Sequence, residues 1–260
     1  MGEPSVDQVL TVLRRVYGRF VDVFAELGDE GATLPSYDDD WSVAQVASHL
    51  GSGTEIFRHY LEAGVNGGPA PSDEINTPIW DAWNAKQPTE QIADAIAVVG
   101  SFLDAVEGLD ADQRNRWRAD MFGTEQTLGS FLRMRLSEQT LHTWDVTVAV
   151  DPSSTLEEEA AGLVAENLGS VVQWAGRPTE RPRSVEVRTS RPERALHLDL
   201  GPSGVSLSPS LDDTSAAELV LPTEAFVRLV YGRLDPGHTP ADVTVKGVEL
   251  DLLRTVFPGL

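Results

Sequence analysis

The sequence places a glutamate and a histidine four positions apart, Glu138 and His142 in the segment SEQTLHTWDV. Residues at this spacing share one face of a helix, so a carboxylate and an imidazole would lie side by side. A histidine far upstream, His49 in the segment WSVAQVASHL, could join them. Two imidazoles and one carboxylate suit zinc or another divalent first-row metal, and such a set leaves coordination positions open for a reactant.

Glu138 and His142 belong to an arc of residues that turns from apolar to ionisable. Leu128 and Phe131 open the arc and indicate that it faces the interior of a helical bundle. The ionisable members that follow are Arg135, Glu138, His142 and Asp145. Charged groups are costly to bury unless they are paired or bind a metal, so the arc marks a candidate site. Two other interpretations remain open: a solvated Glu-His pair, and a purely structural role for His49.

Asp145 follows His142 by three residues and could therefore contact its ring. A carboxylate there would accept a hydrogen bond from an imidazole N–H and select one tautomer of the ring. The alternative is an ordinary charge near the end of the helix. We therefore predict His49, Glu138 and His142 as metal ligands, with Asp145 as a catalytic candidate beside them.

Composition excludes several classes of function. The chain of 260 residues has 20 Lys+Arg, 41 Asp+Glu and a net charge of -21, so it is not expected to bind nucleic acid or a membrane surface. It has no cysteine, which excludes disulfides, thiolate ligands and a thiol nucleophile of its own. We see neither a signal peptide nor an apolar run of the roughly 20 residues that a membrane span needs, and we expect a cytoplasmic protein.

Residues 1–152 are predicted to form a four-helix bundle with crossover connections. Helices are expected over residues 6–27, from Ser42 onward, over 78–109 with a break near Pro88, and over 127–150, whereas 110–126 is predicted to be irregular. The start of the second helix has the strongest signal. Ser42 and Gln45 form a capping box, and Trp41 and Val46 form a hydrophobic staple.

Residues 153–260 are predicted to form a second, α+β domain. We expect one helix over 156–177, and then short strands over 184–189, 195–200, 204–210 and 217–222. A helix capped at Thr223 runs to residue 234, and a short strand at 243–247 and a helix over 248–257 follow. The strands are expected to form a small antiparallel sheet with helices on one face.

Other residues that carry chemistry are interpreted structurally. The arginines at positions 177, 181, 183, 188, 191 and 194 fit a solvated linker and strand edge better than an anion-binding patch, since glutamates intervene. Trp80 and Trp83 are expected to pack in the core, the alternative being a wall over the metal. His59, His197 and His238 have no partner spacing and are interpreted as surface or structural residues.

The segments WSVAQVASHL and EQTLHTWDV resemble the metal-binding pattern of DinB-type bundles, and specifically the mycothiol-dependent maleylpyruvate isomerase-like family. The segment AELVLPTEAFVRLVYGRLDP, with VTVKGVELDLLRTVF after it, is similar to the C-terminal motif of that family. The resemblance implies an N-terminal metal-binding four-helix bundle and a small, sterol-carrier-like α+β domain. It implies His49, Glu138 and His142 as zinc ligands and mycothiol as a cosubstrate. A metal lowers the pKa of a bound thiol, which would explain thiol chemistry in a chain without cysteine.

The resemblance further implies arginines for a dicarboxylate substrate, and Arg233 and Arg228 are the candidates. However, residues 66–84, where the substrate is expected, contain no Arg or Lys. We therefore predict a more neutral small electrophile than maleylpyruvate, acted on by a mycothiol-dependent S-transferase or cis-trans isomerase, with Arg233 and Asp145 as catalytic candidates. The protein is expected to be a monomer or a weak homodimer. A thiol-independent metal-dependent hydrolase and a non-catalytic ligand-binding module are the alternatives.

Overall fold

The computed structural model describes residues 4–38, 40–210 and 216–259, so Asp39, which lies between the first two predicted helices, is outside it. Internal contacts divide the chain into two compact units, Met1–Ser154 and Thr155–Leu260, which we call unit 1 and unit 2. Nowhere in the described part of the chain does a helix combine the length and the apolar character that a membrane crossing requires.

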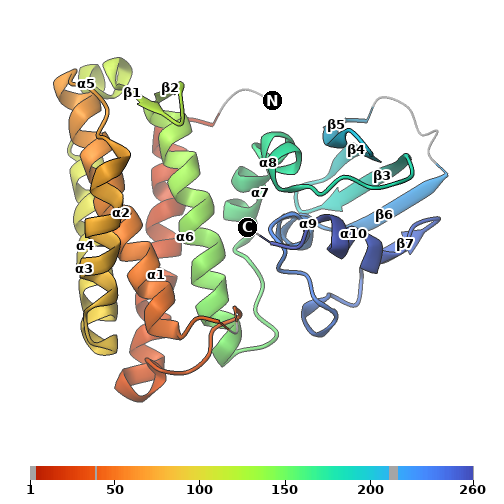
Figure 1. The fold of residues 1–260 in the computed structure, drawn as a ribbon, viewed down its shortest axis with the longest axis horizontal. Helices are drawn as coiled ribbons and strands as arrows, with labels where there is room; N and C mark the ends of the chain where they lie inside the picture. Colours follow the sequence, from red (N-terminus) through yellow and green to blue (C-terminus); the bar gives the residue numbers. More distant parts are fainter. Residues whose placement is uncertain (1–3, 39, 211–215, 260) are drawn as a thin grey trace. The chain divides into compact units, whose positions relative to one another are not determined.

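Four long helices dominate unit 1, as predicted (Figure 1). They are α1 (Val6–Gly31), α2 (Val43–Asn66), α4 (Pro88–Glu107) and α6 (Leu128–Val150). The most extensive helix contacts join α2 to α4 and α1 to α6, and the α2–α6 contact is smaller. The short helices η1 (Asp73–Ile75), α3 (Asn76–Asn84) and α5 (Ala111–Arg116) connect them.

The predicted start of α2 is confirmed in atomic detail. The backbone N–H of Gln45 donates to the Ser42 hydroxyl, and the backbone N–H of Ser42 donates to Gln45 Oε1. These bonds satisfy two donors that a helix start otherwise leaves free. The break near Pro88 is also confirmed, because Pro88 is the first residue of α4, where its missing N–H costs nothing.

The prediction that residues 110–126 are irregular was wrong. They form α5 and most of an antiparallel hairpin of β1 (Arg118–Met121) and β2 (Thr124–Thr127). Phe122 and Gly123 make its turn, both with positive φ, which is the geometry that two-residue hairpins prefer. Phe122 is an unusual residue there, and β1 buries only two side chains, so neither the turn nor the strand has a clear sequence signal.

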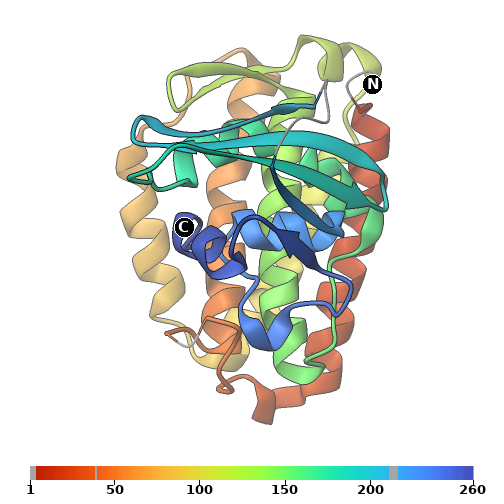
Figure 2. The same ribbon diagram turned by 90° about the vertical axis from the view of Figure 1, so that its right-hand side faces the viewer.

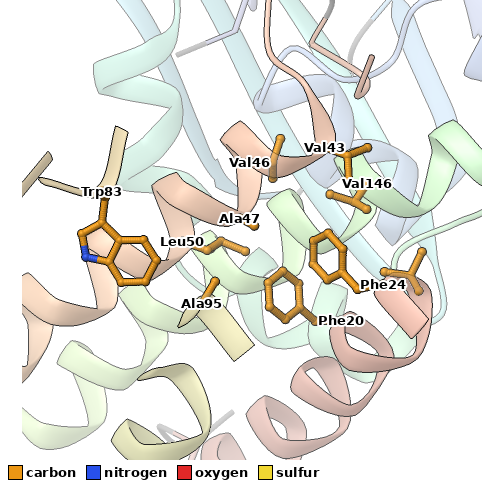
Figure 3. Packing of buried hydrophobic residues seen from close by; sticks show 10 residues of the cluster. Phe20, Phe24, Val43, Val46, Ala47, Leu50, Trp83, Ala95 and Val146 are labelled. Atoms are coloured by element: carbon orange, nitrogen blue, oxygen red, sulfur yellow. The ribbon is translucent and has the colours of Figure 1, made fainter. Parts of the chain in front are cut away.

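A cluster of buried hydrophobic side chains joins α1, α2, α3, α4 and α6 (Figure 3). Its members are Phe20, Val23, Phe24, Val43, Val46, Ala47, Leu50, Trp83, Ala95 and Val146. Trp83 packs against Gly51 of α2, where an added Cβ would overlap the indole ring. The core role predicted for Trp83 is therefore confirmed. For Trp80 it was wrong, since that side chain is 45% exposed.

Unit 2 is built on a five-stranded sheet of order β5-β4-β3-β6-β7 (Figure 2). The strands are β3 (Arg183–Ser190), β4 (Arg194–Gly201), β5 (Gly204–Pro209), β6 (Ala217–Pro222) and β7 (Thr244–Lys246). The predicted antiparallel sheet was wrong at its centre, because β3 and β6 pair in parallel. Alternation of apolar residues marks a strand and its buried face, but it does not identify the neighbouring strand.

The helices of unit 2 cover the apolar face of this sheet. Alternate residues such as Val185, Val187 and Leu219 are buried, and α8 (Leu168–Ala175) and α9 (Thr223–Val230) contact the strands. The single helix predicted over 156–177 is two helices, because α7 (Glu158–Ala165) ends before α8 begins. The unit also contains η2 (Pro236–His238) and α10 (Leu250–Val256).

The predicted cap at Thr223 was wrong. Thr223 is the first residue of α9 rather than its N-cap, and its hydroxyl donates to the carbonyl of Pro192. The preceding residue, Pro222, has the extended backbone that ends β6. A threonine at a helix start can therefore bond to a distant carbonyl when the strand before it leads directly into the helix.

Candidate metal centre

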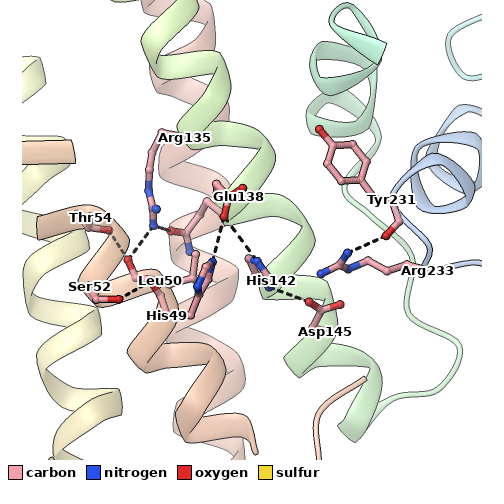
Figure 4. A network of polar contacts seen from close by, with 11 residues as sticks. His49, Leu50, Ser52, Thr54, Arg135, Glu138, His142, Asp145, Tyr231 and Arg233 are labelled. Carbon is pink, nitrogen blue, oxygen red and sulfur yellow. Dashed lines mark hydrogen bonds and ion pairs between the residues drawn. The ribbon is translucent and has the colours of Figure 1, made fainter. Parts of the chain in front are cut away.

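Three side chains from two helices of unit 1 converge on one point (Figure 4). His49 projects from α2, and Glu138 and His142 project from successive turns of α6. His49 Nε2 lies 3.1 Å from Glu138 Oε2, and His142 Nε2 lies 3.6 Å from the same oxygen. One ligand atom from each residue lies within 4.8 Å of the other two. Among the described residues, this is the one such group of three or more.

The three residues are partly open to solvent. The side chains of His49 and Glu138 are 37% and 43% exposed, whereas that of His142 is 15% exposed. A purely structural zinc site is closed by four protein ligands, whereas a catalytic site keeps a position for water or substrate. Three ligands with solvent access match the second arrangement.

Asp145 contacts His142 from the side away from Glu138. Its Oδ2 lies 2.9 Å from His142 Nδ1, and the residue is 1% exposed. In the tautomer that carries its proton on Nδ1, the imidazole donates to this carboxylate and leaves the Nε2 lone pair available to a metal. The backbone carbonyl of Asp145 also accepts a bond from Tyr37, which ties the loop before α2 to α6.

Electrostatics favour the protonation states that metal ligands need. Burial alone would raise the pKa of Glu138, but hydrogen bonds with His142 and His49 hold that pKa well below its ordinary value. Burial lowers the pKa of His49, and the hydrogen bond to Glu138 opposes that shift only in part. A carboxylate that is ionised and an imidazole that is neutral near pH 7 are the forms that bind a metal.

The donor set therefore fits a divalent cation such as zinc. It contains two imidazole nitrogens and one carboxylate oxygen, the combination found in catalytic zinc sites. The ring of His142 is oriented by a carboxylate on its other nitrogen, as is usual for histidine ligands.

Trp41 borders the site, and we predicted only a packing role for it. Its ring centroid lies 5.2 Å from that of His49 and 6.3 Å from that of His142, stacked on the latter. Trp41 also packs against the buried cluster, so the staple interpretation is compatible with this second contact. Its spacing of eight residues from His49, about two helical turns, is the signal that could have identified it.

The structure brings His49, Glu138, His142 and Asp145 together, whereas Arg233 and Arg228 belong to unit 2. Arg233 Nη1 donates to the carbonyl of Tyr231 at 2.9 Å (Figure 4). Arg228 is buried and forms a two-pronged ion pair with Glu224 at 2.8 and 2.9 Å. The Arg228 guanidinium is therefore held in the interior of unit 2 by Glu224.

The remaining histidines and arginines lie where a structural interpretation places them. His59 is exposed, and His238 pairs with Asp235 at 2.6 Å. Arg188 pairs with Glu218 and Arg194 with Glu166. The predicted solvated strand edge was wrong for these two, since β3 and β4 are internal strands of the sheet and the Arg194 side chain is only 15% exposed. His197 lies between two carboxylates of unit 2, those of Glu186 and Asp199.

Two family models cover most of the chain. The model described as the mycothiol maleylpyruvate isomerase N-terminal domain matches residues 13–147, and the C-terminal domain model of that family matches residues 158–254. The chain belongs to the mycothiol maleylpyruvate isomerase family. No curated protein matches it.

Solved structures of the family share the fold. The crystal structure of the mycothiol-dependent maleylpyruvate isomerase and that of a histidine-to-alanine mutant both match with a TM-score of 0.67. Each match covers 95% of this chain and 95% of the other, at 13% sequence identity. The predicted fold class is thereby confirmed: a helical N-terminal bundle followed by a small α+β domain.

Proposed function

We propose that this protein is a metal-dependent isomerase or S-transferase that uses mycothiol, or a similar low-molecular-weight thiol, as cosubstrate. The observation that carries the proposal is the convergence of His49, Glu138 and His142 in a member of this family. A divalent metal such as zinc, when bound, would lower the pKa of a coordinated thiol so that it is a nucleophile near pH 7.

The residues of the chain would hold and tune this centre. His49, Glu138 and His142 supply the ligand atoms, and Asp145 keeps the proton of His142 on Nδ1. Trp41 forms an apolar wall against both imidazoles, which limits the access of water on that side. Arg233 is proposed as a substrate-binding residue from unit 2, because a guanidinium recognises a carboxylate with paired hydrogen bonds.

The proposed substrate is a small electrophile with less negative charge than maleylpyruvate. Residues 66–84, which include η1 and α3 of unit 1, contain no Arg or Lys. The next cation along the chain, Lys86, is already engaged, since it pairs with Asp94 and lies 3.4 Å from the centroid of the Trp83 ring. A dianion would therefore lack paired cations in this part of unit 1.

The test combines metal analysis, thermal stability and turnover. We expect the purified protein to contain one tightly bound divalent metal per chain and to melt at a higher temperature with mycothiol than with an unrelated thiol. Turnover of a conjugated electrophile with a single carboxylate should require the thiol and exceed turnover of maleylpyruvate. A protein without metal at neutral pH would contradict the proposal. Turnover that does not need a thiol would indicate the hydrolase alternative.

A further inference from the structure

The guanidinium of Arg135 is buried beside the metal centre, one helical turn before Glu138. The residue is 2% exposed and extends from α6 toward α2 (Figure 4). Among the described residues, no carboxylate forms a direct ion pair with it, and the favourable charge nearby is that of Glu138, which acts across space rather than by a hydrogen bond. A buried cation without a paired carboxylate is unfavourable for folding, so its presence here requires another explanation.

Arg135 bonds to the immediate neighbours of two candidate ligands. Its Nη2 donates to the carbonyl of Leu50 at 3.2 Å, and Leu50 follows His49 on α2. The same nitrogen donates to Gln139 Oε1 at 3.0 Å, and Gln139 follows Glu138 on α6. One nitrogen atom thus joins the two helix turns that carry the ligands.

The contact between α2 and α6 is smaller than the contacts that each of them makes with another helix. α2 makes its most extensive helix contact with α4, and α6 makes its own with α1. The guanidinium lies against α2 at Gly53, where an added Cβ would make ordinary van der Waals contact with Arg135 Nη1 at 3.6 Å. Apolar packing between the two helices includes the stacked rings of Phe57 and Phe131, whose centroids lie 4.9 Å apart, and the hydrogen bonds of Arg135 add a polar link beside that pair.

We infer that Arg135 is a positioning residue of the metal centre, which holds the α2 turn carrying His49 against the α6 turn carrying Glu138 and His142. The inference rests on the metal ligands of the proposed function, although not on the thiol chemistry. Hydrogen bonds from a charged donor are roughly twice as strong as neutral ones, which suits a cross-link between two helices. Gln139 extends the cross-link, because its Nε2 donates to the Thr143 hydroxyl, next to His142.

The experiment compares three variants of the full-length protein. Arg135→Met removes the cross-link and the charge, and Gln139→Met removes only its α6 acceptor. Arg228→Met is the matched control, a buried arginine of unit 2 that is paired with Glu224. The readouts are the Zn²⁺ dissociation constant by chelator competition, the visible absorption spectrum of the Co²⁺-substituted protein, and the melting temperature of the metal-free protein.

Arg135→Met should raise the Zn²⁺ dissociation constant about tenfold. This is the lower end of the loss of affinity that follows when a residue that orients the metal ligands is replaced. It should also alter the Co²⁺ spectrum without lowering the melting temperature of the metal-free protein, because it removes an unpaired buried charge. Gln139→Met should act in the same direction with a smaller effect. Arg228→Met should lower the melting temperature, since it leaves Glu224 unpaired, and leave the Zn²⁺ constant and the Co²⁺ spectrum unchanged.

An unchanged dissociation constant and spectrum in Arg135→Met would overturn the inference. Tighter Zn²⁺ binding would overturn it as well, since it would mean that the arginine acts only by repelling the metal. If Arg135→Met does not fold, Gln139→Met decides by the same two readouts. A wild type that binds Zn²⁺ but shows no thiol-dependent turnover would refute the proposed function and leave the inference on Arg135 intact.

Discussion

The two histidines at the centre are held in different ways. His142 has a buried carboxylate on Nδ1, whereas the ring of His49 contacts Glu138, the Trp41 ring and the His142 ring. His142 is therefore oriented before a metal binds, and His49 is the ligand whose position depends more on its helix. This asymmetry leads to separate expectations for the individual residues.

The ligand prediction is tested by removing His49 or Glu138. Either alanine variant takes away one of three protein ligands, so the metal content should fall from one per chain toward zero. His59→Ala is the matched control, an exposed histidine on the same helix. Elemental analysis after dialysis measures the result. A full metal complement in His49→Ala would contradict the assignment.

Asp145→Asn should weaken metal binding by a factor of about 10 to 100, the range typical of lost partners behind a metal ligand. The asparagine can present its N–H₂ to His142 Nδ1 and so favour the wrong tautomer. Asp235→Asn, which alters the equivalent pair with His238 in unit 2, is the control and should leave metal affinity unchanged. Equal affinities in the two variants would show that Asp145 does not act through His142.

The stability of the metal-free protein should fall in acid in two stages. The pKa of His49 is lowered in the fold from its ordinary value of 6.5, so below that pH the unfolded state takes up the proton first. The contribution of neutral His49 to the free energy of unfolding is complete above pH 6.5 and is lost as the pH falls through the pKa of His49 in the folded protein. Glu138 acts in the same direction, below its ordinary value of 4.5. Urea unfolding at a series of pH values measures how the free energy of unfolding changes with pH. Near pH 6 this dependence should be shallower in His49→Gln than in the wild type. An identical dependence in the two proteins would refute the lowered pKa of His49.

The site residues were predictable because ionisable side chains rarely recur at helical spacing on the apolar face of a helix. Glu138, His142 and Asp145 are recognisable from spacing alone, and His49 from its place after a well-marked helix start. The bond from Arg135 to the Leu50 carbonyl was not predictable, because a backbone acceptor has no signature in the sequence. The contact of Trp41 with both imidazoles depends on how two helices cross, which one helix cannot reveal.

Among the elements, α2 is the one whose packing the site most depends on. It carries His49, and it accommodates the Trp83 ring where Gly51 has no side chain. Gly51→Ala should destabilise the protein by about 1–3 kcal/mol, as overpacking does. Gly18→Ala on α1 is the control, since an added Cβ there meets nothing within 4 Å. It should stabilise the protein by about 0.5–1 kcal/mol through helix propensity.

Chemical denaturation of both glycine variants measures these effects. The metal affinity of Gly51→Ala should also fall, because a shift of α2 moves His49 away from α6. A Gly51→Ala variant as stable as Gly18→Ala would contradict the packing of Trp83 against α2.

The elements differ in how far their sequences determine them. The long helices and the α2 start were predictable because caps and periodicity act locally. The β1–β2 hairpin was missed because its turn residue, Phe122, is not a usual turn former. The parallel pairing of β3 with β6 was missed because strand order depends on contacts between distant segments.

At the scale of the whole molecule, we propose that the two units are separate domains, with a boundary near residue 154. All three candidate ligands, together with Asp145 and Arg135, lie in unit 1. A fragment of residues 1–154 should therefore fold and bind one metal, although without Arg233 it should not turn over substrate. Circular dichroism and metal analysis of the fragment test this, and a fragment that folds but binds no metal would show that unit 2 is needed to form the centre.

The contact between His49 and Glu138 spans 89 positions of the chain. The metal site therefore does not exist in any short stretch of nascent chain. It forms only after α6 has been synthesised and has packed into the bundle, because a long-range contact must first close its loop. A metal ion would thus be captured late in folding and would stabilise a completed bundle rather than guide its assembly. During synthesis, metal occupancy would report that the N-terminal unit has reached its final arrangement.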